Sequence, residues 1–222
     1  MKSLEVLIFL GPPGSGKGTQ AQILTDNLNL NHLSVGDLLR ENILNNTELG
    51  KLASNYVKSG ELVPDELIID LMDSYITNIK NKTDNSGIIL DGFPRTINQA
   101  IALENKIKQL NVSIKAVINL DIPDQKILNR LAARGREDDK PELIKNRLKV
   151  YRNQTEPLLE FYSERSLLET INGDQSETDV SSAIINVLKA EVAWCLTIKL
   201  ISWLRLKKKF HIWGKQEVLL PK

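Results

Sequence analysis

The chain lacks most of the features that mark secreted, membrane-spanning and nucleic-acid-binding proteins. It has a single cysteine, Cys195, so a framework of internal disulfides is excluded and a cytoplasmic location is expected. The formal net charge is only +1, which gives no long-range field to attract nucleic acid. No apolar run reaches the length of a membrane-spanning helix. Because the first apolar run begins a few residues after Met1, we expect no leader peptide.

What the chain does have is enough apolar sequence for a full hydrophobic core. Of its 222 residues 41% are apolar, which fits one domain or one domain with small inserts. Apolar runs that alternate with helical periodicity predict an α/β fold, in which helices cover both faces of a parallel sheet. The predicted strands are 6–10, 32–34, 87–91, 116–120 and 167–171. The predicted helices include 97–110, 124–133, 178–189 and a long helix over 141–161 that Pro157 should bend, and 81–87 is predicted to be a polar loop.

A glycine-rich turn between the first strand and the first helix is the most informative stretch of the chain. Gly11, Gly14, Gly16 and Gly18 allow backbone angles that other residues avoid, so successive N–H groups can converge on one point. That point lies at a helix N-terminus, where the helix dipole favours negative charge, and Lys17 adds a mobile cation. A nucleoside polyphosphate is the ligand most consistent with this arrangement.

Two details qualify this interpretation. The residue after Lys17 is Gly18, so the hydroxyl of the phosphate-binding loop comes one place later, at Thr19, where direct contact with Mg²⁺ is in question. The alternative is a strand-to-helix turn in which the glycines only relieve crowding. Four glycines and a lysine that follow a buried strand favour the phosphate loop over that alternative.

Arginines are concentrated at the predicted carboxyl edge of the sheet and on the helices that leave it. Phosphoryl transfer requires two mutually repelling polyanions to be held in line, and guanidinium groups are suited to this because they are always charged and bidentate. Any one of these arginines could instead be a solvated charge on a helix face. The set comprises Arg40, Arg95, Arg130, Arg134, Arg136 and Arg147.

Four motifs occur in the order and at the spacings of the adenylate kinases. They are GPPGSGKGTQ at 11–20, GDLLR at 36–40, DGFPRT at 91–96 with Gln99, and REDD at 136–139 followed by Arg147. The chain resembles this family over residues 1–189. The resemblance implies the P-loop fold of nucleoside monophosphate kinases: a five-stranded parallel sheet, an insert at 34–63 that binds the nucleoside monophosphate, and a very short lid at about 134–140.

The resemblance also implies a reaction, transfer of a phosphoryl group from MgATP to AMP, and roles for residues of this chain. The residues implied to bind ATP are Gly14, Ser15, Gly16, Lys17, Gly18, Thr19, Arg130 and Arg134. Those implied to bind AMP are Val35, Arg40, Glu61, Leu62, Val63, Gly92, Phe93, Pro94, Arg95, Gln99, Arg136 and Arg147. The catalytic residues would be Lys17, Arg95, Arg136, Arg147 and Asp91, with Asp138 and Asp139 fixing the closed lid.

The same resemblance implies the cofactor and the partners. Mg²⁺ would be held mainly through water and the nucleotide phosphates, with Asp91 orienting that water. No zinc is expected, because only Gly135 separates Arg134 from Arg136 and the lid therefore has no room for a zinc-binding insert. The partners would be ATP, AMP and ADP, and the protein would be a monomer.

One position leaves the identity of the monophosphate open. Val35 stands where adenylate kinases typically have threonine and the related uridylate/cytidylate kinases have alanine. Thr96 and Gln99 favour AMP, because an amide offers the adenine edge both a donor and an acceptor. UMP or CMP is the alternative substrate. A nucleotide sensor or scaffold without turnover is a further alternative, which the intact Lys17 and the arginines argue against.

The last 33 residues, 190–222, differ in composition from the rest of the chain. They contain all three tryptophans, together with seven basic and two acidic residues, and the resemblance does not extend to them. One apolar helical face followed by the basic run 205–209 could contact an anionic membrane surface or a partner groove. Packing against the body of the protein, or an appendage without structure, is the alternative.

Overall fold

The computed structural model describes residues 4–28, 30–82 and 87–189. Residues 1–182 form one compact unit, and the described part of a second unit, 183–189, is helical. The predicted helical contact surface at 190–222 lies outside the described residues.

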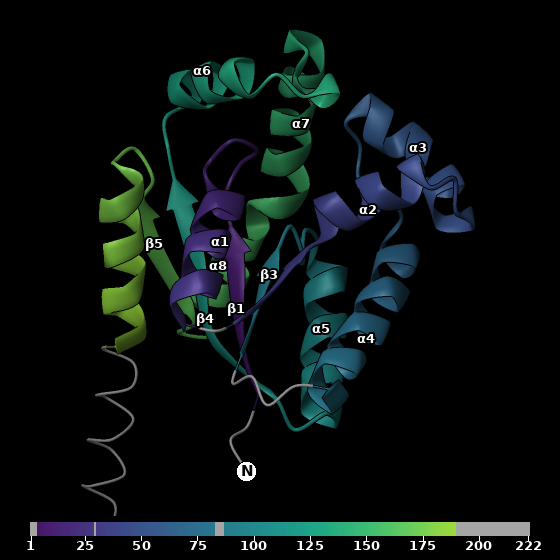
Figure 1. Ribbon diagram of the computed structural model, residues 1–222. Coiled ribbons are helices and arrows are strands. Elements are labelled where there is room, and N and C mark those ends of the chain that lie inside the picture. Colours follow the sequence, from purple (N-terminus) through teal and green to yellow (C-terminus); the bar gives the residue numbers. More distant parts are fainter. Residues whose placement is uncertain (1–3, 29, 83–86, 190–222) are drawn as a thin grey trace, which may run out of the picture. The chain divides into compact units, whose positions relative to one another are not determined.

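A five-stranded parallel sheet organises the first unit, as predicted (Figure 1). Its order is β2-β3-β1-β4-β5, and every neighbouring pair is parallel. The central strand β1 carries an unbroken apolar run because both of its faces are covered, which is typical of parallel sheets. The strands are β1 (Glu5–Leu10), β2 (Asn31–Ser34), β3 (Gly87–Asp91), β4 (Ser113–Asp121) and β5 (Leu168–Asn172).

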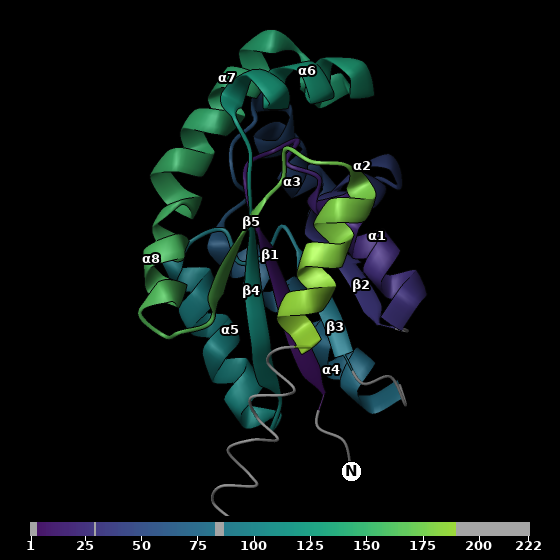
Figure 2. The ribbon, with the colours of Figure 1, turned by 90° about the vertical axis from the view of Figure 1, so that its left-hand side faces the viewer.

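Helices lie on both faces of the sheet (Figure 2). Alternate residues of β1 point to opposite faces, so Val6, Ile8 and Leu10 join a core cluster with side chains of α4, α5 and α8, whereas α1 contacts β2 and β3 from the other face. The helices are α1 (Lys17–Leu28), α2 (Val35–Leu44), α3 (Glu48–Ser59), α4 (Asp65–Lys82), α5 (Ile97–Gln109), α6 (Asp124–Arg134), α7 (Pro141–Val150) and α8 (Pro157–Ser163). A short 3-10 turn, Glu137–Asp139, precedes α7.

Helices α2 and α3 form the predicted insert between β2 and α4. Ser34 and Thr47 cap their N-termini, accepting hydrogen bonds from the backbone N–H groups of Asp37 and Gly50. The two helices meet at Gly50, where a Cβ atom would lie 2.0 Å from the carbonyl oxygen of Asn42. Only glycine fits this contact, which fixes how closely the helices pack.

The structure corrects two of the predicted segments. The helix predicted over 141–161 with a bend at Pro157 is interrupted before that proline by a π-helical segment, Tyr151–Thr155, whose last bond runs from the N–H of Glu156 to the carbonyl of Tyr151. The polar loop predicted at 81–87 includes residues that are not loop, because α4 continues to Lys82 and β3 already begins at Gly87. Favourable packing of the apolar face of α4 extends the helix into a polar sequence that, by itself, signals a loop.

Candidate active site

The glycine-rich turn follows β1 directly and leads into α1, as the sequence predicts. Gly11 has a φ of 136°, and a Cβ atom there would lie 2.8 Å from the carbonyl oxygen of Leu120 on the neighbouring strand β4. Gly14 has a φ of 81°, and its Cβ would lie 2.9 Å from the side chain of Leu131. Glycine at these two positions lets the turn lie flat against β4 and α6, with its opposite side toward a cavity.

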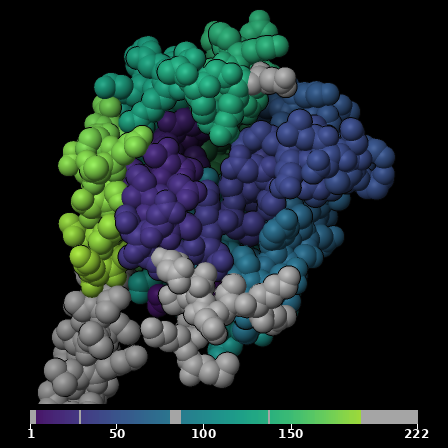
Figure 3. Space-filling model, in the orientation of Figure 1, coloured from purple at the N-terminus to yellow at the C-terminus, as the bar shows by residue number. Residues whose placement is uncertain are grey.

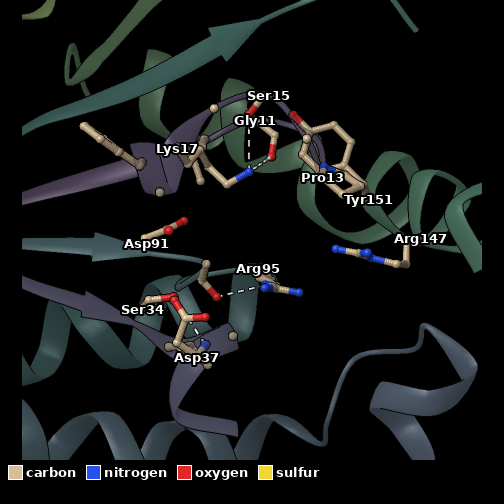
Figure 4. A pocket seen from close by; sticks show the side chains of 18 of the residues that line it. Gly11, Pro13, Ser15, Lys17, Ser34, Asp37, Asp91, Arg95, Arg147 and Tyr151 are labelled. Carbon is tan, nitrogen blue, oxygen red and sulfur yellow. Dashed lines mark hydrogen bonds between the residues drawn. The ribbon is translucent and has the colours of Figure 1, made fainter. Parts of the chain in front are cut away.

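The ammonium group of Lys17 folds back over this turn. Its Nζ donates hydrogen bonds to the carbonyl oxygens of Gly11 and Pro12, at 2.7 and 2.9 Å, and to Oγ of Ser15 at 3.3 Å (Figure 4). Burial lowers the pKa of Lys17 to about 8, since the nearby carboxylate of Asp91 only partly offsets the loss of water. Carbonyl oxygens balance the charge of the Lys17 ammonium only in part. An anion that enters the turn would supply the remaining negative charge.

A cavity of about 720 Å³ opens beside the turn, at the carboxyl edge of the sheet. The space-filling view shows the surface hollowed beneath the segment that carries α6 and α7 (Figure 3). Five acidic side chains line the cavity, against a larger number of basic ones. The basic residues are Lys17, Arg40, Arg95, Arg130, Arg134, Arg136 and Arg147.

Two of these arginines are half-buried and face the same space from different elements. Arg95 follows β3, Arg147 lies on α7, and Figure 4 shows their guanidinium groups directed toward each other across the cavity. Burial lowers the pKa of Arg95, and the nearby charge of Arg147 lowers it further. The site therefore holds like charges close together, an arrangement that a polyanion bound between them would stabilise.

The short lid is held by ion pairs. The guanidinium of Arg134 donates two hydrogen bonds to Asp139, at 2.6 and 2.8 Å, and the backbone N–H of Arg136 donates to the same carboxylate at 3.1 Å. Arg147 pairs with Asp138 at 2.9 Å. Burial alone would raise the pKa of Asp139, but the hydrogen bond from Arg134 lowers it overall. An ion pair therefore joins this segment to Arg147 on α7.

The insert contacts α7 at the same end of the cavity. Gly60 caps the C-terminus of α3 with a φ of 75°, and a Cβ atom there would lie 3.0 Å from Cγ of Arg147. The side-chain amide of Asn146 donates hydrogen bonds to the carbonyl of Ser59 at 2.8 Å and to the carboxylate of Glu61 at 3.0 Å. Residues that were predicted to contact AMP therefore lie beside an arginine that was predicted to contact the transferred phosphoryl group.

Asp91 is the carboxylate best placed for a divalent cation. It ends β3, lines the cavity, and its Oδ2 would lie 3.5 Å from a Cβ at Gly18, so the carboxylate lies directly beside the start of α1. Burial opposes its ionisation, but His32, with Nε2 3.6 Å from Oδ2, and Lys17 lower the pKa of Asp91 overall. Across the described residues, no three acidic, histidine or cysteine side chains form a metal-binding group. One carboxylate beside a phosphate cradle fits Mg²⁺, which retains most of its water ligands.

Almost every predicted site residue lines this one cavity. The exception is Phe93, which is 1% exposed and belongs to the core cluster, because the turn after β3 directs its ring into the core and leaves Gly92 and Pro94 at the cavity. Val35 is 3% exposed and contributes to both the core and the cavity wall.

The cavity also contains residues that the sequence did not single out as site residues. His32 lies on β2 and faces Asp91. Tyr151 and Thr155 enter from the π-helical segment, and burial raises the pKa of Tyr151 to about 12. Their spacing of four and eight residues from Arg147 within the predicted helix is a signal that could have found them, because residues four apart lie on one face of a helix.

Comparisons with known proteins identify the family. The family model described as adenylate kinase matches residues 9–167, which is more than half of the chain. The chain belongs to the adenylate kinase family. It is 50% identical over 175 residues to adenylate kinase 1 of Nostoc sp., an alignment that covers 79% of this chain and 94% of that protein. It is 45% identical over 183 residues to adenylate kinase 1 of Synechocystis sp., covering 82% of this chain and 96% of that one.

A third member of the adenylate kinase family, from Lachnospira eligens, is 40% identical over 213 residues, covering 82% of this chain and 99% of that protein. The residues that the adenylate kinase family model matches include the glycine-rich turn at 11–20 and the segments 34–63 and 134–140. Among the helices that the structure describes, none is long and apolar enough to cross a membrane.

Proposed function

We propose that the protein catalyses reversible transfer of the terminal phosphoryl group of MgATP to AMP, giving two ADP. The observation that carries this proposal is the convergence, in one cavity, of Lys17 from the glycine-rich turn, Arg95 from β3, and Arg134 and Arg147 from either side of the lid. Membership of the adenylate kinase family supports the same reaction.

The residues suggest how the transfer proceeds. The phosphates of ATP would lie in the turn after β1, where Lys17 would exchange its contacts with the carbonyls of Gly11 and Pro12 for phosphate oxygens. An anionic oxygen of the AMP phosphate forms a bond to the terminal phosphorus of ATP while the bond from that phosphorus to ADP breaks. Since the attacking oxygen is already ionised, no general base is needed. Arg95 and Arg147 stabilise the charge on the transferring group.

Magnesium would bind near Asp91, mostly through water and the phosphates. When bound it neutralises charge on the β- and γ-phosphates of ATP. Asp91, ionised because His32 and Lys17 stabilise its charge, would accept hydrogen bonds from the water around the ion. The shift of the loop hydroxyl to Thr19 makes this role of Asp91 more important.

Closure of the insert and the lid would exclude water from the transferring group. The lid is short, so exclusion would depend on Arg134 and Arg136 closing over the phosphates together with the turn held by Asp139. Separating Arg134 from Asp139 is not required, because a guanidinium can bond a carboxylate and a phosphate at once.

A uridylate or cytidylate kinase is the second candidate, because Val35 replaces the typical threonine in the wall of the cavity. A coupled assay across AMP, UMP, CMP and GMP with ATP as donor separates the two. The proposal predicts that the rate with AMP greatly exceeds the others. A rate with UMP or CMP above the rate with AMP would overturn it, and absence of turnover with all four would favour the sensor or scaffold.

Action as a monomer in the cytoplasm, without zinc, also forms part of this proposal. So does an accessory contact of residues 190–222 with a membrane surface or a partner. These statements derive from the sequence alone, through its single cysteine, short lid and basic C-terminal stretch.

A further inference from the structure

A carboxylate outside the cavity wall is hydrogen-bonded to a residue that lines the cavity. Asp65 is the first residue of α4, directly after the insert, and is half-buried. Its Oδ1 accepts a hydrogen bond from Nε2 of Gln99 at 2.7 Å, and its Oδ2 accepts one from the hydroxyl of Thr96 at 2.8 Å. Gln99 is 2% exposed and lines the cavity, so Asp65 reaches the site through a buried side chain.

The orientation of the Gln99 amide follows from its two neighbours. An ionised carboxylate can only accept hydrogen bonds, so the atom that faces Asp65 must be Nε2. A backbone N–H can only donate, so the atom 2.8 Å from the N–H of Arg95 must be Oε1. Both contacts require the same orientation. Turning the amide over would place oxygen against carboxylate and N–H against N–H, two repulsive contacts in a buried place.

The same amide holds the main chain of Arg95. The backbone N–H of Arg95 donates to Gln99, its carbonyl accepts from the hydroxyl of Thr155 at 2.9 Å, and its own Nε donates to the carbonyl of Gly92 at 2.9 Å. The backbone N–H, the backbone carbonyl and the side chain of Arg95 are therefore each held by a hydrogen bond. Of these three contacts, the one with Gln99 also involves a side chain that is expected to face the base of AMP.

We propose that Asp65 is a positioning residue that sets the orientation of Gln99, and through it both the choice of base and the placement of Arg95. This rests on the proposed function, in which Gln99 faces the base of AMP. After its contacts with Asp65 and Arg95, the amide retains one Nε2 hydrogen and one Oε1 lone pair. With the orientation fixed, Oε1 accepts from the amino group of adenine and Nε2 donates to the neighbouring ring nitrogen.

Guanine presents the opposite pattern at that edge, an oxygen acceptor and a ring N–H donor. It would be satisfied only by an amide that is turned over. Asp65 supplies one of the two contacts that prevent reversal of the Gln99 amide. It therefore contributes to discrimination against GMP without touching the base itself. Discrimination by an unpaired buried polar group is stronger than discrimination by shape.

The test compares Asp65→Ala and Asp65→Ser with two controls in steady-state kinetics. Asp65→Asn can still offer an oxygen to Gln99 and an amide to Thr96, so it serves as the conservative variant. Glu66→Ala removes the other acidic residue of the first turn of α4, which is exposed. The KM for AMP is measured at saturating ATP, the KM for ATP at saturating AMP, and the kcat/KM ratio of GMP to AMP for each variant, with thermal unfolding in parallel.

We expect Asp65→Ala and Asp65→Ser to raise the KM for AMP about tenfold and to raise the GMP to AMP ratio, while the KM for ATP changes less than about twofold. Glu66→Ala should remain close to the wild type. Asp65→Asn should keep the KM for AMP near the wild-type value, because its oxygen can still accept from Gln99, but it should raise the GMP to AMP ratio, because its amide can instead donate to a Gln99 that is turned over. In a Gln99→Ala background the Asp65→Ala change should have little further effect, because Asp65 acts through Gln99.

Four results would overturn the inference. The first is a KM for AMP and a GMP to AMP ratio unchanged in Asp65→Ala, and the second is an equal increase in both KM values. The third is an undiminished effect of Asp65→Ala in the Gln99→Ala background. The fourth is loss of folding in both Asp65→Ala and Asp65→Ser, which would assign Asp65 to stability. Wild-type protein that makes no ADP from AMP would instead defeat the proposed function.

Discussion

Lys17 shows how the site depends on its ligand for electrostatic balance. Its ammonium group is buried, makes its contacts with neutral oxygens of its own loop, and has a pKa lowered to about 8 by burial. A lysine in this state is charged at neutral pH but loses its proton at moderately alkaline pH. Only the protonated form attracts the phosphates of ATP fully.

This argument predicts a pH dependence. Above about pH 8 the free enzyme loses the charge on Lys17, so kcat/KM for ATP should fall as pH rises. Within the bound complex the phosphates raise the pKa of Lys17, so kcat should fall only at higher pH. Initial-rate measurements between pH 7 and pH 10 check this. Lys17→Arg is the control: its guanidinium stays charged, so its lower kcat/KM should not decline near pH 8.

At the scale of elements, the insert depends on one glycine. Helices α2 and α3 approach each other at Gly50, where there is no space for a side chain. Since the end of the insert also contacts α7 through Asn146, the angle between these helices affects where Glu61 and its neighbours lie.

Gly50→Ala should therefore separate α2 from α3. We expect the free energy of unfolding to fall by about 1–3 kcal/mol and the KM for AMP to rise more than the KM for ATP. Chemical denaturation and steady-state kinetics measure the two effects. Leu52→Ala on the same helix, where the side chain is 56% exposed, is the control and should leave both values near those of the wild type. Equal KM changes for both nucleotides in Gly50→Ala would contradict this role for the insert.

The π-helical segment is the second element with a specific task. It widens the helix between α7 and α8 and brings the hydroxyl of Thr155 to the carbonyl oxygen of Arg95, 60 residues earlier in the chain. A regular helix over the same residues would rotate that hydroxyl by part of a turn.

Thr155→Val keeps the shape of the side chain and removes this hydrogen bond. We expect the free energy of unfolding to fall by about 1 kcal/mol and the KM for AMP to rise severalfold, because Arg95 loses one of its main-chain contacts. The matched control is Thr25→Val, whose hydroxyl bonds to the carbonyl of Ala21 within α1. Thr25→Val should leave the KM for AMP unchanged, and a similar rise in KM in both variants would exclude a specific role for Thr155.

At the scale of the whole molecule, the residues predicted to form the active site lie within residues 1–182. All residues that line the cavity fall within the first compact unit. The basic, tryptophan-containing residues 190–222 lie outside the described part of the chain and contribute none of the predicted site residues.

A version of the protein that ends at Lys189 should therefore retain the kcat and both KM values of the full chain. If the C-terminal residues contact anionic membranes, sedimentation with vesicles of anionic lipid should retain the full chain and release the shortened version. Raising the salt concentration should weaken that retention, because the contact is largely electrostatic. Equal sedimentation of the two forms would refute the membrane contact, and a large drop in kcat would refute the assignment of catalysis to the first unit.

Much of the architecture follows from local patterns. Apolar runs such as 87–91 form strands that are buried on both faces, and their ends predict the edge at which Asp91 lies. The glycines before Lys17 specify a turn that only glycine permits. These features depend on residues near one another in sequence, so composition and spacing were sufficient to predict them.

The sequence by itself determined the parallel sheet, the phosphate turn and the family, because each is encoded in short patterns with few physical solutions. Only the tertiary structure decided that Phe93 lies in the core, that Thr155 holds Arg95, and that Asp65 reaches Gln99 across 34 positions. Contacts of this kind depend on how α4, α5 and the π-helical segment pack together. Packing is the sum of many small interactions along the whole chain, and no single pattern in the sequence records it.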